Sequence, residues 1–197
     1  MLTFITGNVN KVREFERILG DALAHTPLDL DEIQAVIDSA KARGPHRLAT
    51  YVRGRLPDVP EAEVLDTAEL LLEIIESVPL VLAAAAQEAE ERSLGHVVQP
   101  VLDRATRYFL HPVDLMPEIT LGLPGLLDDT YLGFRILQVL DEGPEPLVEW
   151  DLDHPTKLIR KLLEHSVGQQ LDAISSLAFE EVADDVRQSW GAESLNA

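Results

Sequence analysis

A chain of 197 residues with 46% hydrophobic residues is long enough for the core of one ordinary domain, or of one domain with an appendage, and is too apolar for global disorder. Its formal net charge of −19, from 16 basic and 35 acidic residues, argues against a nucleic-acid backbone as a partner and indicates a well-solvated surface. The absence of cysteine excludes disulfides and thiol chemistry and fits a reducing cytoplasm.

Neither a signal peptide nor a transmembrane segment is expected. Polar and charged residues, among them Asn8, Asn10 and Lys11, interrupt the N-terminus where a signal peptide needs an unbroken apolar stretch. No run of 18 apolar residues occurs elsewhere in the chain. We therefore expect a soluble, cytoplasmic protein.

The N-terminus begins with a predicted strand, a tight turn and a helix. Residues 2–5 form a short apolar run, residues 6–8 have the composition of a turn, and residues 11–19 place apolar side chains at helical spacing. Such a turn presents backbone N–H groups and the positive end of a helix dipole to an anion. The expected phosphate-binding residues are Thr6, Gly7, Asn8 and Lys11.

This opening resembles the inosine-triphosphate pyrophosphatase family over residues 1–38. The second motif of the family is matched by the run Leu30-Asp31-Glu32-Ile33-Gln34, and its first motif by Thr6, Gly7, Asn8, Lys11 and Glu14. The resemblance implies Mg²⁺-dependent hydrolysis of non-canonical purine nucleoside triphosphates to monophosphate and pyrophosphate. It also implies that Glu32 is a magnesium ligand.

The later motifs of that family are missing. The chain has no counterpart of the loops that hold the base and the phosphates, and no long β-rich core is predicted after residue 40. Residues 64–70 faintly echo the segment that carries the catalytic aspartate, which makes Asp66 a weak candidate for the catalytic base. The same residues continue into a helical pattern, so we interpret them as helix.

From about residue 45 onward the sequence predicts one helix after another. An apolar stripe with helical spacing covers residues 64–75, and Pro79 predicts a kink or a break after it. Residues 80–92 form a further helix that Gly95 is expected to close. The alanines at positions 83–86 leave two interpretations open, namely close packing on a second copy of the chain or ordinary burial within a monomer.

A helical hairpin with a stiff connection is predicted between residues 97 and 140. The first helix must end before Pro112, because proline removes a donor and pushes the preceding residue out of the α region. Gly122 permits the chain to turn back. Asp128 is the expected N-cap, and Asp129 the expected first-turn acid, of the second helix.

The same hairpin resembles the YkvA-type family of small helical domains, whose function is unknown. The resemblance covers residues 97–141 and is carried by Tyr108, Pro112, Asp114, Leu115, Pro117, Glu118, Gly125, Leu127, Asp128 and Asp129. It implies a helical architecture and no particular chemistry.

Acidic residues of this hairpin are weak candidates for a metal site beside His111. Four carboxylates would suit Mg²⁺ or Ca²⁺, and a pair of them would suit general acid-base catalysis. Helix capping explains at least two of them without any ligand, and we favour capping. The four candidates are Asp114, Glu118, Asp128 and Asp129.

The C-terminal part contains two more predicted helices. A helix entry at residues 153–156 precedes apolar positions at helical spacing. A last helix is predicted from Val167 through Ala178 and on towards Val186. Lys157, Arg160 and Lys161 form the one local basic patch, which could meet a phosphate but is more often a solvated face.

Together these patterns predict a mainly α protein, a multi-helix body with a short N-terminal βα segment. The expected domains are a truncated pyrophosphatase-like segment (residues 1–43), a YkvA-like helical domain (44–190) and a tail (191–197). The favoured function is a non-catalytic interaction or scaffold module. The alternative is a Mg²⁺-dependent nucleoside triphosphate pyrophosphatase.

Overall fold

The computed structural model describes residues 30–44, 46–110, 116, 121–138, 140 and 151–177, and the regular structure in this part of the chain is helical throughout. A mainly α fold is thus confirmed for these residues, whereas the predicted strand, turn and helix within residues 1–29 lie outside them. Residues 165–177 are also helical. The named elements are α2 (Leu30–Ala42), α3 (His46–Arg55), α4 (Glu61–Glu91), α5 (Gly95–Leu110), the 3₁₀ helix η1 (Leu123–Leu126), α7 (Leu127–Leu137) and α8 (Asp153–Leu162).

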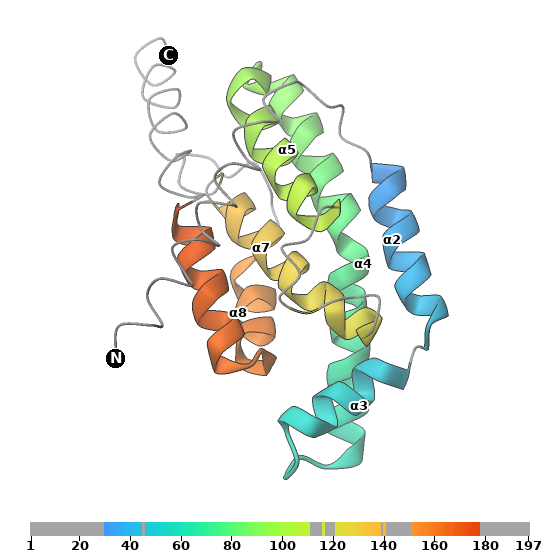
Figure 1. Ribbon diagram of the computed structural model, residues 1–197. Helices are drawn as coiled ribbons and strands as arrows, with labels where there is room; N and C mark the ends of the chain where they lie inside the picture. The colour runs from blue at the N-terminus through green and yellow to red at the C-terminus, as the bar shows by residue number, and fades with distance from the viewer. Residues whose placement is uncertain are drawn as a thin grey trace.

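The longest helix, α4, packs against α2, α3 and α5 (Figure 1). Of the predicted apolar stripe, Val64, Ala68, Leu71 and Ile75 are buried. Leu65, which the prediction placed in the same stripe, is 52% exposed. The buried positions recur every three or four residues and so share one face of the helix. Neither α4 nor any other helix of the described residues has the length and apolarity that a bilayer crossing requires.

The break predicted at Pro79 is absent, because α4 continues through it. A proline inside a helix costs about 3 kcal/mol. Pro79 is itself buried, and so are Val78, Val81 and Leu82 around it. Burial of a large apolar side chain contributes roughly 1.5–3 kcal/mol, so packing on both sides of the proline offsets the local cost.

Ser93, and not Gly95, closes α4. Ser93 has a φ of 60°, the left-handed conformation that ends many helices. The Leu94 N–H donates to the Ala89 carbonyl at 2.7 Å, and the Ser93 N–H donates to the Glu90 carbonyl at 3.1 Å. This is the Schellman pattern, which leaves Gly95 to begin α5.

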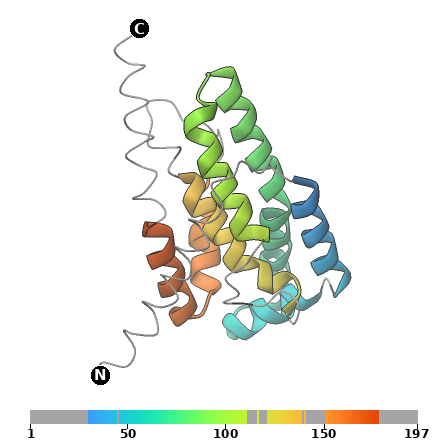
Figure 2. The same ribbon diagram turned by 45° about the horizontal axis from the view of Figure 1, so that its top comes forward.

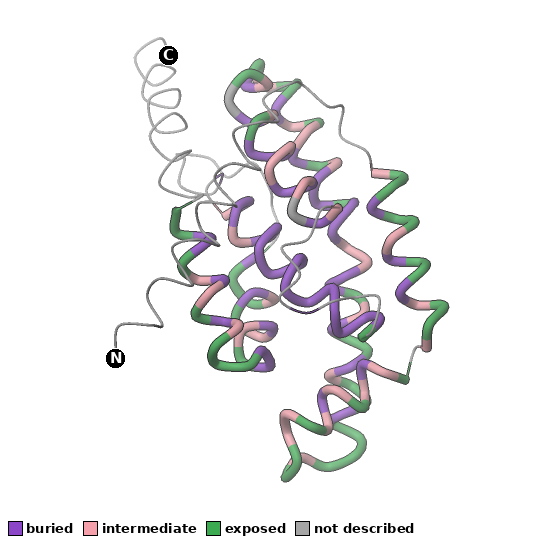
Figure 3. The backbone as a smooth tube through the Cα atoms, viewed as in Figure 1, coloured by how far each residue is buried: buried purple, intermediate pink, exposed green. Residues whose placement is uncertain are grey.

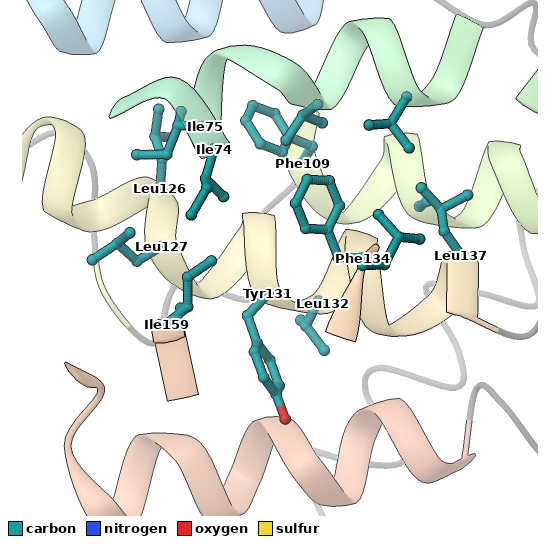
Figure 4. Packing of buried hydrophobic residues seen from close by; sticks show 14 of the residues in the cluster. Ile74, Ile75, Phe109, Leu126, Leu127, Tyr131, Leu132, Phe134, Leu137 and Ile159 are labelled. Carbon is teal, nitrogen blue, oxygen red and sulfur yellow. The ribbon is translucent and has the colours of Figure 1, made fainter. Parts of the chain in front are cut away.

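The central helix of the described residues is α7, which contacts α4, α5 and α8. Every residue of α7 except Arg135 is buried (Figure 3). Figure 4 shows Phe134 of α7 and Phe109 of α5 within the core that surrounds it. A helix buried on all sides must be apolar nearly all round, as this one is after its first turn.

α2 belongs to the same core as the later helices. Ile33, Ile37 and Ala40 of α2 are fully buried within it. The C-terminal end of α2 also meets Gly122, which has a φ of +69°, as predicted for the point where the chain turns back. A Cβ on Gly122 would stand 3.4 Å from the Ala40 carbonyl oxygen, so the glycine also permits a close approach.

Side chains of α3 contact the chain at the C-terminal end of α8. Figure 2 shows the ribbon of the same helices turned by 45°. The Tyr51 hydroxyl donates to the Leu162 carbonyl at 3.0 Å. Arg55 pairs with Glu164 at 2.8 Å and stacks over the Tyr51 ring at 5.0 Å. Carbonyls at the end of a helix lack intrahelical donors, and Tyr51 supplies one.

Candidate functional site

The residues assigned from the pyrophosphatase resemblance are only partly within the described residues. Thr6, Gly7, Asn8 and Lys11 lie outside them. Glu32 is exposed on α2 and Asp66 is exposed on α4. Phosphate binding, magnesium ligation and catalysis by these residues stay predictions.

Asp128 is not the N-cap of α7. Leu126 occupies the N-cap position, and Asp128 and Asp129 lie in the first turn, where both are buried. The Asp128 Oδ2 accepts a hydrogen bond from the Met116 backbone N–H at 3.0 Å. The carboxylate therefore bonds to the connection that precedes α7, a long-range contact that the local sequence pattern does not show.

Two of the four carboxylates of the predicted metal site, Asp128 and Asp129, lie within the described residues. Asp114, Glu118 and His111 lie outside the described residues. Within the described ranges, no group of three or more histidine, aspartate or glutamate side chains is arranged to hold a metal ion. Asp128 accepts a hydrogen bond from a backbone N–H, and this contact stabilises the fold.

A cleft lies between α7 and α8. Its volume is about 460 Å³. We call it the cationic cleft, and its lining residues are Tyr131, Arg135, Asp153, Thr156, Lys157, Arg160 and Lys161. The basic patch predicted on one helix is thus joined by an arginine from a second helix.

Arg160 is fixed by Asp172, which lies in the helical stretch 165–177. The Arg160 Nε lies 3.0 and 3.2 Å from the two Asp172 carboxylate oxygens, and Nη2 lies 2.9 Å from Oδ2. The Tyr131 hydroxyl donates to Asp172 Oδ1 at 2.6 Å. One carboxylate therefore joins α7, α8 and the last helical stretch.

The pKa values of this network follow from its contacts. Burial, followed by the hydrogen bond to Asp172, raises the pKa of Tyr131 to about 12. Burial alone would raise the pKa of Asp172, but hydrogen bonds from Arg160 and Tyr131 hold it below its usual value. The hydrogen bond to Asp172 raises the pKa of Arg160. All three groups keep their ordinary charge states at neutral pH.

Gly168 leaves room for the Arg160 guanidinium beside the helical stretch 165–177. A Cβ at this glycine would stand 2.1 Å from Arg160 Nη1 and 2.3 Å from Cζ. Any side chain at position 168 would displace the guanidinium from this place. The backbone at Gly168 and the carboxylate of Asp172 together define where Arg160 lies.

The other cations of the cleft differ in how they are paired. Lys157 forms an ion pair with Asp153, four residues earlier on α8. The Arg135 Nη1 donates to the Gln138 side chain, a neutral partner. None of the ion pairs among the described residues includes Arg135 or Lys161.

The start of α8 is held by Asp151, which the sequence analysis did not identify. Its Oδ1 accepts the backbone N–H groups of Asp153 and His154 at 3.0 and 3.2 Å. Thr156, at the base of the cleft, donates to the Leu152 carbonyl at 2.9 Å. The predicted helix entry at residues 153–156 is confirmed.

The sequence analysis did not predict Arg135 as a residue of the cationic cleft, although the sequence contains a feature that indicates its exposure. Arg135 is the only charged residue between Leu132 and Leu137, within a helix that is otherwise apolar there. A single cation in such a helix marks the position that faces away from the core. Its proximity to α8 depends on tertiary packing and has no local signature.

No family model, no curated protein and no solved structure matches this chain.

Proposed function

We propose that this protein is a non-catalytic helical interaction or scaffold module with a remnant phosphate-binding turn at its N-terminus. The observation that carries the proposal is the hydrogen bond of Asp128, one of the four candidate acids of the YkvA-like hairpin. Its carboxylate is buried and accepts the Met116 N–H, so it stabilises the connection before α7. This bond gives the carboxylate a structural role that requires neither a ligand nor a substrate.

The test is an assay for hydrolysis of inosine and xanthosine triphosphates with Mg²⁺. We expect no pyrophosphate release above that of a matched Lys11→Ala, Glu32→Ala double variant, because hydrolysis also needs a placed base and a closed pocket. Release by the natural chain well above that of the double variant would overturn the proposal. Weak triphosphate binding that Lys11→Ala reduces and Asp128→Ala leaves unchanged is compatible with a remnant turn.

The second candidate is the Mg²⁺-dependent pyrophosphatase itself. Its support is the two ordered motif matches, together with the exposure of Glu32 and Asp66, which leaves both carboxylates accessible from solvent. In that function Glu32 would hold the metal and Asp66 would act as the base. Activity lost in both Glu32→Gln and Asp66→Asn would establish it.

A second copy of the chain is the partner that we propose for the module. On the outer face of α4, Leu80 is 62% exposed and Ala84, one turn later, is also exposed. A small residue there lets another helix approach closely. If this face pairs, light scattering will give a dimer for the natural chain and a monomer for Ala84→Glu. A monomer mass for the natural chain would reject the pairing.

A further inference from the structure

We propose that the cationic cleft binds the phosphate group of a small, soluble phosphate monoester. Neither resemblance assigns a ligand to this place. The cleft lies between α7 and α8, and its lining brings together four of the sixteen basic residues of an acidic chain. Gathering like charges costs free energy, and a bound anion offsets that cost.

The charge left in the cleft matches a dianion. Asp172 neutralises Arg160, and Asp153 neutralises Lys157. The charges of Arg135 and Lys161 have no such partner among the described residues. Two positive charges therefore remain, and a phosphate monoester carries about −1.5 to −2 at neutral pH.

Contacts within the fold hold part of the cleft in place. Arg160 is clamped by Asp172 and lies against Gly168, so it forms a fixed wall of the cleft. Arg135 projects from a helix whose other residues are all buried, which limits the movement of its backbone. An ordered site loses less conformational entropy when it binds a ligand.

The volume indicates that more than an inorganic ion fits. Small-molecule sites commonly have volumes of about 300–1,000 Å³. At about 460 Å³, the cleft is within this range. The cleft therefore has room for a phosphate group together with an organic part of the ester.

The test uses phenyl phosphate as the probe and phenyl sulfate as its monoanionic counterpart. Titration calorimetry is performed on the full chain carrying Lys11→Ala, so that the predicted N-terminal turn does not contribute. We expect phenyl phosphate to bind at least about tenfold more tightly than phenyl sulfate, and its affinity to fall below about pH 6 as the ester gains a proton. Equal binding of the two probes, or no binding at millimolar concentration, would overturn the proposal.

Two variants and a matched control locate the site. Lys161→Gln and Arg135→Gln should each weaken phenyl phosphate binding about tenfold, because each removes a charged donor. Lys41→Gln on α2 changes the net charge equally and should alter the affinity less than about twofold, because it lies away from the cleft. Equal effects in the control and in Lys161→Gln would show non-specific attraction and reject the site.

A further experiment distinguishes a soluble phosphate ester from a lipid headgroup that carries the same phosphate group. Vesicles of phosphatidylcholine with phosphatidic acid are sedimented with the protein. We expect the protein to remain in the supernatant. Sedimentation with these vesicles in the absence of phenyl phosphate binding would contradict the proposal. Failure of this proposal leaves the hydrolysis test unaffected, because that test depends on Lys11 and Glu32.

Discussion

The two ends of α7 differ in where they place a charged side chain. At its N-terminal end Asp128 is buried and bonded to the backbone of Met116. Two turns later Arg135 is the one residue of the helix that is not buried, and it lines a cleft with other cations. A charge bonded inside the protein stabilises the fold, whereas a charge facing a cleft is available to a ligand. Substitutions at the two ends should therefore affect different properties.

The largest effect on stability is expected for Asp128→Ala. The change leaves the Met116 N–H without its charged acceptor, which should lower the free energy of unfolding by about 1.5–3 kcal/mol. Denaturant unfolding measures this loss. Asp128→Asn keeps an acceptor oxygen and should lose less. Added Mg²⁺ should not raise the melting temperature, and a rise that disappears in Asp128→Ala would instead indicate a metal site.

An intermediate effect is expected for Tyr131→Phe, which removes the hydroxyl that bridges α7 to Asp172. One hydrogen bond contributes about 0.5–1.5 kcal/mol, and unfolding curves should show a loss of that size. The ring stays in place, so helix content should not change. A loss near zero would mean that Arg160 alone orients Asp172.

The same tyrosine predicts a dependence of stability on alkaline pH. Its pKa rises from 10.0 in the unfolded chain to about 12 in the folded protein, so the folded state retains its proton longer. This contribution to stability is complete below pH 10 and is lost as the pH rises from 10 towards 12. The natural chain should therefore lose more stability over this interval than Tyr131→Phe. Parallel stability curves for the two proteins would contradict the assignment.

The smallest effect on stability is expected at the cleft. Lys161 has no ion pair among the described residues and lies on the exposed side of α8. Lys161→Gln should change the free energy of unfolding by less than about 0.5 kcal/mol. A large loss of stability would show that Lys161 stabilises the fold, and the cleft would then no longer differ from Asp128 in this respect.

Local patterns predicted the helices better than the contacts between them. The stripe at residues 64–75, the helix after Gly95 and the entry of α8 follow from apolar spacing and turn composition, which depend on neighbouring residues. The continuity of α4 through Pro79 could not be predicted, because it depends on packing partners distant in the sequence.

The candidate site shows the same limit. Lys157, Arg160 and Lys161 lie close together in the sequence, which predicts a basic patch on α8. Arg135 joins this patch only because α7 and α8 pack together. Asp128 is a residue type that favours the N-cap, and the sequence alone shows neither the start of α7 one residue earlier nor the contact with Met116. Both roles depend on contacts between residues far apart in the sequence, and such contacts cannot be derived from a single sequence.

The hydrogen bond from Tyr51 to Leu162 has a consequence for the order of folding. It joins residues 111 positions apart, whereas the contacts of α4 with α5 join neighbouring segments. The entropy of closing a loop grows with its length, so α8 should dock on α3 after the earlier helices have paired. Because α8 forms one wall of the cleft, the cleft exists only in the fully assembled chain. A ligand held there would slow the release of α8, and hydrogen exchange in residues 153–162 would report it first.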